Sequence, residues 1–228
     1  MWNSGRGFMA IWSDVGPADL AAYHDWLLKE HVAERVGIPG FIAVRVFRRE
    51  VGDNLRFFIL YETEAPAVLA SDAYVERLNH PTAKTRAIMP KLRAFVRGTG
   101  RLVQSEGVCA GGVVRVLRLS HADPSLGDAA TRDAMFGHLG RLDGVLAARL
   151  FDVDAGATTI QTSEKTMRSG PDDSFSQLLV IEGVDTAALE AASPVLDGIL
   201  VDRVGDPPPL DQFYHLVAEL QARSLRPA

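Results

Sequence analysis

The feature that most constrains the fold of this chain is an internal repeat. Residues 40–47 (Gly-Phe-Ile-Ala-Val-Arg-Val-Phe) align with residues 144–151 (Gly-Val-Leu-Ala-Ala-Arg-Leu-Phe), 104 positions later. Three further matches follow in the same order: 8–12 with 112–116, 58–62 with 178–182, and 101–103 with 215–217, once an insertion near 155–174 is allowed. Four matches in one order indicate two copies of one unit, residues 1–108 and residues 109–228.

The first copy has the element order β-α-β-β-α-β, which is typical of a ferredoxin-like split βαβ unit. Pro17 is well placed to open a long helix, and Pro39-Gly40 ends it. The second helical region is expected to continue through Pro90 as far as residue 96. The expected elements are a strand at 6–13, the long helix, strands at 41–51 and 55–63, helical segments at 66–78 and 82–96, and a strand at 99–108.

The second copy repeats this order, with one insertion. Residues 155–174 are polar and are expected to form an exposed hairpin or a mobile loop. The tail is expected as a strand, although its apolar spacing also fits a helix. The expected elements are strands at 112–119, 144–153, 176–182 and 211–221, with helices at 126–141 and 185–197.

Two strands are apolar at consecutive positions, which indicates that both faces of each sheet are buried. These strands contain residues 57–61 and 178–181. A sheet with one face in water would instead alternate apolar and polar side chains. The cover for one sheet is then the other. The predicted fold is α+β: two tandem ferredoxin-like (βαββαβ) repeats packed sheet to sheet as a barrel within one chain.

Charge and cysteine content exclude several classes of function. The net charge of −5 and the absence of a run of Lys and Arg argue against nucleic acid or an anionic membrane as partner. The single cysteine, Cys109, excludes an internal disulfide and a multi-cysteine metal site. No nucleotide-binding glycine motif, Walker loop or Gly-x-Ser-x-Gly elbow occurs. No signal peptide or membrane span is evident, so we expect a cytoplasmic protein.

The long helix carries two histidines, which are unusual on its apolar stripe. At about 100° per residue, Leu27 and His31 share a narrow arc, with Tyr23 and His24 at its edges. A neutral imidazole at position 31 could act as a general base or bond a ligand, whereas the alternative is a buried structural histidine. His24 lies about 10 Å along the helix from His31, which is too far for the two to share a metal ion.

Five other residues are candidates for binding a substrate, each with a structural alternative. Trp26 could line a cavity, as could Tyr23, or both could be core. Tyr61 could donate to a substrate oxygen, with Trp12 on the neighbouring strand, or the two could form a packing pair. His80 could lie at the rim of a site or only terminate a helix.

The first copy resembles the dimeric α+β barrel superfamily. The resemblance is carried by Trp26-Leu27-Leu28-Lys29-Glu30-His31, by residues 38–41 (Ile-Pro-Gly-Phe), and by a strand ending in Phe47. It is closest to the EthD-like members and to stress-responsive or tandem members. The resemblance implies a small-molecule pocket between the sheet and the first helix. Residues 133–138 of the second copy lack the Trp and the Glu-His pair, so a functional pocket is expected in the first copy only.

The superfamily includes cofactor-free monooxygenases, isomerases, dehydratases and haem proteins, so the fold does not select a reaction. The leading hypothesis is a cofactor-independent enzyme that transfers protons on a small apolar or aromatic metabolite. His31 would be the base, and His24, Trp26 or Tyr61 would position the substrate. One alternative is a non-catalytic protein that binds a small hydrophobic ligand. Another is a haem-handling protein with His31 or His80 as iron ligand. Pairing of two chains into a homodimer stays open.

Overall fold

The computed structural model describes residues 2, 5–154, 156, 162–167, 175–200 and 210–225. The chain divides into two compact units. The N-terminal unit comprises Gly5–Arg101, Asp154–Ser174 and Val217–Ala228, and the C-terminal unit comprises Met1–Ser4, Leu102–Val153 and Phe175–Leu216. The insertion and the end of the chain therefore belong with the first copy of the repeat. The boundary between the copies at residues 108 and 109 stays a prediction about the repeat itself.

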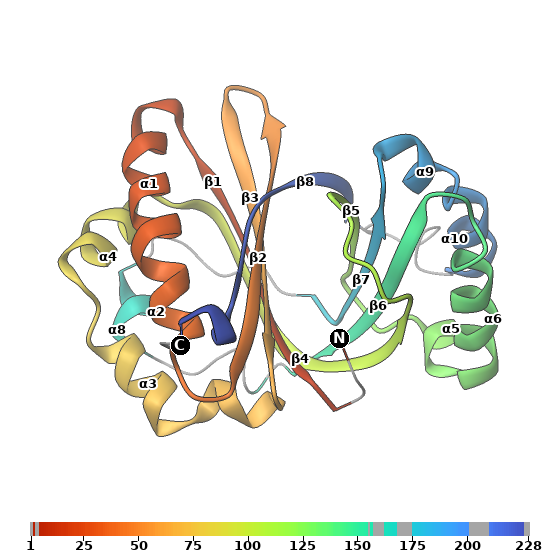
Figure 1. Cartoon of the computed structure of the whole chain (residues 1–228), viewed down its shortest axis with the longest axis horizontal. Helices are drawn as coiled ribbons and strands as arrows, with labels where there is room; N and C mark the ends of the chain where they lie inside the picture. The colour runs from red at the N-terminus through yellow and green to blue at the C-terminus, as the bar shows by residue number, and fades with distance from the viewer. Residues whose placement is uncertain are drawn as a thin grey trace. The chain divides into compact units, whose positions relative to one another are not determined.

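In the N-terminal unit, a β-sheet is covered on one face by short helices (Figure 1). Its strands pair antiparallel in the order β4-β1-β3-β2. The strands are β1 (Gly7–Val15), β2 (Phe41–Val51), β3 (Asn54–Thr63) and β4 (Arg93–Glu106). The helices are η1 (Pro17–Asp19), α1 (Leu20–Trp26), η2 (Leu27–His31), α2 (Val32–Val36), η3 (Pro66–Ala70), α3 (Asp72–Asn79), α4 (Ala83–Ile88), η4 (Met89–Lys91), α8 (Ser163–Thr166) and η6 (Ala222–Leu225).

The C-terminal unit has the same plan, with strands in the order β8-β5-β7-β6. Helices again lie on one face of the sheet (Figure 1). The strands are β5 (Val113–Leu119), β6 (Val145–Val153), β7 (Gln177–Gly183) and β8 (Leu210–Gln221). The helices are α5 (Pro124–Gly127), α6 (Ala129–Leu139), α9 (Thr186–Glu190) and α10 (Ser193–Ile199).

Each unit has its own hydrophobic core between its helices and its sheet. In the N-terminal unit, Trp26, Leu27 and Val36 from the long helical segment pack with Phe57 and Tyr61 of β3. In the C-terminal unit, the corresponding core joins side chains of α6, α9 and α10 to those of β5, β6 and β7. Apolar burial of this kind stabilises each helical layer on its sheet.

The same glycine turn leads into β2 and into β6. Gly40 has φ of +89° and Gly144 has φ of +77°, a region that L side chains rarely adopt. The carbonyl of each glycine accepts a backbone hydrogen bond, from Glu64 at 2.8 Å and from Val184 at 2.9 Å. In both units, a β-bulge follows one residue later in the strand. Glycine is therefore required where each helix turns back into its sheet.

The two arginines that recur in the repeat both form ion pairs. Arg45 of β2 lies 3.7 Å from Glu219. Arg149 of β6 pairs with the buried carboxylate of Glu182 on β7. Both arginines at this position of the repeat therefore contact an acidic side chain of a neighbouring strand.

The α+β class and the ferredoxin-like, dimeric α+β barrel type of fold are confirmed. The tail is a strand, β8, as expected, and the helical alternative is wrong. Two details differ from expectation. The second helical region ends at Lys91 rather than at residue 96, because Pro90 lacks the N–H that would continue the helix. Residues 162–167, expected in an exposed or mobile segment, include the buried Thr162 and Glu164. The rest of that segment, apart from Gly156, lies outside the described residues.

Candidate functional site

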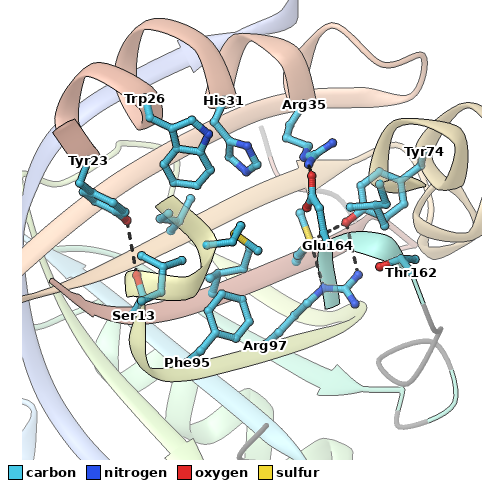
Figure 2. A pocket seen from close by; sticks show the side chains of 16 residues that line it. Ser13, Tyr23, Trp26, His31, Arg35, Tyr74, Phe95, Arg97, Thr162 and Glu164 are labelled. Atoms are coloured by element: carbon cyan, nitrogen blue, oxygen red, sulfur yellow. Dashed lines mark hydrogen bonds and ion pairs between the residues drawn. The ribbon is translucent and has the colours of Figure 1, made fainter. Parts of the chain in front are cut away.

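A cavity lies between the helices and the sheet of the N-terminal unit (Figure 2). Its empty space of about 620 Å³ includes volume that is open to solvent. Apolar and aromatic side chains form most of its wall, and a few polar groups converge among them. The lining residues are Met9, Ile11, Ser13, Tyr23, Trp26, His31, Arg35, Ile59, Tyr74, Leu78, Met89, Leu92, Phe95, Arg97, Thr162 and Glu164.

The helical wall of the cavity contains a π-helical turn. Residues Leu27–His31 form this turn between α1 and α2, and the three segments together make one continuous helix. A π-turn inserts one extra residue into the helix and is frequent at functional sites. The turn ends at His31, so it sets the direction in which this side chain leaves the helix. Tyr23, Trp26, His31 and Arg35 all line the cavity.

His31 is the central polar group of this wall. Its side chain is buried, and its ring lies 4.3 Å from the ring of Trp26, centroid to centroid. Nδ1 is buried and has no hydrogen-bond partner among the residues that the structure describes. Burial, with a smaller contribution from the nearby positive charge of Arg35, lowers the pKa of His31 well below 6.5. The imidazole is therefore neutral at pH 7 and can accept a proton or a hydrogen bond.

One helical turn beyond His31, Arg35 forms a buried ion pair with Glu164. The guanidinium Nη2 donates to Oε1 of Glu164, and the two side chains are only 2% and 7% exposed. Glu164 belongs to α8, which packs against α3. A buried carboxylate needs such a partner, because an unpaired charge in this environment is costly. The pair therefore fixes α8 against the cavity.

A second arginine reaches the cavity from the sheet. Arg97 of β4 donates to the hydroxyl of Tyr74 at 3.3 Å and to the sulfur of Met9 at 3.5 Å. Figure 2 shows Arg97, Tyr74 and Glu164 grouped at one end of the cavity. Tyr23 and Ser13 lie at the other end, with their hydroxyl oxygens 3.4 Å apart. The cavity thus has a charged end and a hydroxyl end, with His31 and Trp26 between them.

An irregularity in the sheet accompanies the hydroxyl end. The pairing of β1 with β4 shifts register between Trp12 and Asp14, so Ser13 lies at a bulge. On the facing strand, Ala94 has φ of +45°, in the left-handed region that is uncommon for alanine. Bulges of this kind re-aim side chains beside functional sites. Here Ser13 and Phe95 both line the cavity.

The structure brings three of the seven predicted site residues together and leaves four outside the cavity wall. Tyr23, Trp26 and His31 line it. Burial raises the pKa of the Tyr23 hydroxyl above its usual value, so this group stays protonated. Trp26 donates from Nε1 to the hydroxyl of Thr85 at 3.0 Å, which fixes the indole ring.

His24, Tyr61, Trp12 and His80 do not line this cavity. The His24 ring packs edge-on against Phe57, and its pKa is lowered, chiefly by burial. The Tyr61 hydroxyl is buried, and burial raises its pKa above the usual value. Trp12 stacks on Phe58 with 4.9 Å between ring centroids; alternation along β1 puts it on the face opposite Ile11 and Ser13. His80 is exposed at the end of α3 and bonds through Nδ1 to the carbonyl oxygen of Glu76.

The sequence interpretation missed Arg35, Tyr74, Arg97 and Glu164. Arg35 could have been found, because it lies four residues after His31 and so shares its helix face. Val96 and Arg97 are consecutive in β4, so their side chains point to opposite faces of the sheet. An arginine in a strand is usually exposed, so Arg97 was not expected in a cavity. Nothing in the sequence indicated that Glu164, in the insertion, would be buried in the other copy's unit.

Two searches of the described part of the chain gave negative results. Within it, no group of three or more His, Cys, Asp or Glu side chains is arranged to hold a metal ion. None of the helices in these ranges has the length and hydrophobicity needed to cross a membrane.

Comparison with known proteins shows similarity at the level of structure. No family model matches the sequence, and no curated protein matches it. A putative monooxygenase from Fusobacterium nucleatum is similar over 97% of this chain and 96% of its own, with a TM-score of 0.60 and 8% identity. An anthrone oxidase-like protein is similar over 96% and 94%, with a TM-score of 0.60 and 10% identity.

A putative chlorite dismutase is also similar, over 93% of this chain and 95% of its own, with a TM-score of 0.53 and 12% identity. At these identities, the similarity concerns the fold and not the reaction. The chain therefore shares the α+β fold of monooxygenase-like and chlorite dismutase-like proteins across almost its whole length.

Proposed function

We propose that this chain is an enzyme that removes a proton from a small aromatic or largely apolar substrate, with His31 as general base. The observation that carries the proposal is the buried, neutral imidazole whose Nδ1 has no hydrogen-bond partner among the described residues. A base that is neutral at physiological pH and sheltered from water is suited to proton abstraction. The aromatic wall around it favours a flat, apolar substrate.

Cofactor-independent oxygenation is the reaction we favour within proton-transfer chemistry. Nδ1 of His31 would take a proton from an activated CH₂ group, and the carbanion would react with dioxygen. Loss of water then leaves a carbonyl, so that CH₂ and O₂ give C=O and H₂O. The structural likeness to an anthrone oxidase-like protein supports the choice of this reaction for testing. Tyr23 and Trp26 would hold the ring system, since both line the cavity beside the base.

The proposal is tested by oxygen consumption with anthrone, which the reaction would convert to anthraquinone and water. We expect the wild-type protein to accelerate oxygen uptake, and His31→Gln to reduce kcat by at least about 100-fold, the usual contribution of a general base. His80→Gln is the matched control, because His80 is exposed and outside the cavity. Equal rates for the wild type and His31→Gln would refute the assignment of the base.

Ligand binding without catalysis is the alternative, and one observation favours it. Catalytic histidines are commonly oriented by a carboxylate or carbonyl on the second ring nitrogen, whereas the charged group that contributes to the pKa shift of His31 is the guanidinium of Arg35. In that case His31→Gln would change ligand affinity modestly and no turnover would be measured. A haem-handling function is tested separately by the presence or absence of a Soret band in the purified protein.

A further inference from the structure

The described residues at the charged end of the cavity include more cationic than anionic side chains. Its lining contains two guanidinium groups, Arg35 and Arg97, and one carboxylate, Glu164. His31 is the third basic side chain among the described lining residues. It is neutral because burial lowers its pKa. Tyrosine hydroxyls are uncharged at pH 7. Among the described lining residues, cationic side chains therefore outnumber carboxylates by two to one.

The geometry of Arg35 adds a second, independent observation. The arginine is 1% exposed, and its Nη2 is used by Glu164. Its Nη1 is also buried and has no hydrogen-bond partner among the described residues. A buried N–H donor without an acceptor is costly, and more so when it belongs to a charged group. The guanidinium can donate from both terminal nitrogens, so one donor face remains for a ligand.

We propose that this end of the cavity is an anion subsite, and that the ligand is a small aromatic molecule with one acidic group, a carboxylate or a phenolate. The acidic group accepts a hydrogen bond from Nη1 of Arg35, and the positive charge of Arg97 supports it. The aromatic part lies along Trp26 and Phe95 toward Tyr23. This inference rests on the proposed function and narrows its substrate class.

The helix places the anion subsite and the base on one face. Arg35 follows His31 by four residues, and Cβ atoms at this spacing lie about 5–6 Å apart on the helix surface. A ligand whose acidic group is held at Arg35 is therefore expected to extend along the same face as His31. In this arrangement Arg35 is a binding residue, and His31 alone would act on the C–H bond.

Three probes of matched shape and different charge test the subsite: 1-naphthoate, 1-naphthamide and 1-naphthylmethylammonium. We expect the wild-type protein, measured by calorimetry at pH 7, to bind 1-naphthoate at least tenfold more tightly than 1-naphthamide. The ammonium probe should bind most weakly. Binding of the amide as tight as that of the carboxylate, or tighter, overturns the proposal.

Two variants assign the preference to these side chains. Glu164→Gln removes the one carboxylate among the described lining residues. The affinity for 1-naphthoate should therefore rise about threefold or more, while that for 1-naphthamide changes less than twofold. Arg35→Lys keeps a charge but loses the two-nitrogen fork, so the preference for the carboxylate should fall several-fold. Weaker binding of 1-naphthoate by Glu164→Gln overturns the proposal, as does an unchanged preference in Arg35→Lys.

The matched control is Glu182→Gln in the C-terminal unit. Glu182 is 1% exposed and pairs with Arg149, so the substitution breaks a buried ion pair of the same kind, and neither residue lines the cavity. Its affinity for all three probes should equal that of the wild type; a changed carboxylate preference in this control counts against the subsite.

The binding assay also separates this inference from the proposed reaction. His31→Gln should keep the carboxylate preference while losing turnover of anthrone. A carboxylate preference without any turnover would refute the reaction and leave the subsite. Turnover that requires His31 without a carboxylate preference would refute the subsite alone.

Discussion

The Arg35–Glu164 ion pair offers the sharpest test of how the N-terminal unit is stabilised. In Arg35→Met, the carboxylate of Glu164 keeps its buried position but loses this cationic partner. Both side chains are almost fully buried, at 2% and 7% exposure, so solvent screens the pair weakly. Removing one partner of a buried pair costs about 3–5 kcal/mol, whereas an exposed pair contributes about 0–1 kcal/mol. We therefore expect a loss of about 4 kcal/mol in the free energy of unfolding.

The assay is urea unfolding at pH 7, followed by circular dichroism, with thermal melting as a second measure. For a chain of this size, about 4 kcal/mol corresponds to a fall in Tm of roughly 10 °C. The double variant Arg35→Met/Glu164→Leu should recover most of the loss, because no charge is then left buried without its partner. Lys29→Met is the control: it breaks an ion pair with Asp25 in which both side chains are well exposed, and should change stability by less than about 0.5 kcal/mol.

Two results would refute the reasoning. A loss of less than about 1 kcal/mol in Arg35→Met would mean that the pair behaves like a surface pair. A double variant no more stable than Arg35→Met would mean that the cost does not come from the buried charge of Glu164.

Three further predictions concern His31, Trp26 and Gly40. Because the folded-state pKa of His31 is lowered well below 6.5, the unfolded chain binds a proton that the folded chain does not. Stability should fall as the pH drops below 6.5, by up to about 1.4 kcal/mol per pH unit from this group, until the folded-state pKa is reached; an identical pH slope in His31→Gln would contradict this. Trp26→Phe loses the 3.0 Å hydrogen bond to Thr85 and should cost about 1–2 kcal/mol in urea unfolding; no loss would show that the bond is not formed. Gly40→Ala places a Cβ 2.6 Å from Cγ2 of Val68 at a φ of +89° and should lower stability by about 2 kcal/mol, so an unchanged Tm would be the contrary result.

Much of the fold could be predicted from the sequence because the signals that define it are local. The strands around Gly40 and Gly144 were located correctly, because glycine marks the turn and a run of apolar residues marks the strand that follows. His31 was correctly expected on the buried side of its helix, because its spacing from Leu27 places both on one face.

The rest depended on interactions that the local sequence does not encode. The π-helical turn at Leu27–His31 has no distinctive residue pattern, so a regular helix was assumed. Glu164 lies in a polar insertion, and only its pairing with Arg35 from a distant helix makes its burial favourable. Trp12 was expected near the site because its strand neighbours that of Tyr61, but a strand sends alternate side chains to opposite faces.

The central claim is that the cavity holds an aromatic acid beside a neutral imidazole at position 31. The most direct measurement is NMR of protein with isotope-labelled histidine at pH 7, with the His31 resonances assigned by their absence in His31→Gln. We predict chemical shifts of the neutral ring in the free protein, and a change in the His31 resonances alone when 1-naphthoate is added. A protonated His31 ring, or a ring unaffected by saturating 1-naphthoate, would contradict the account.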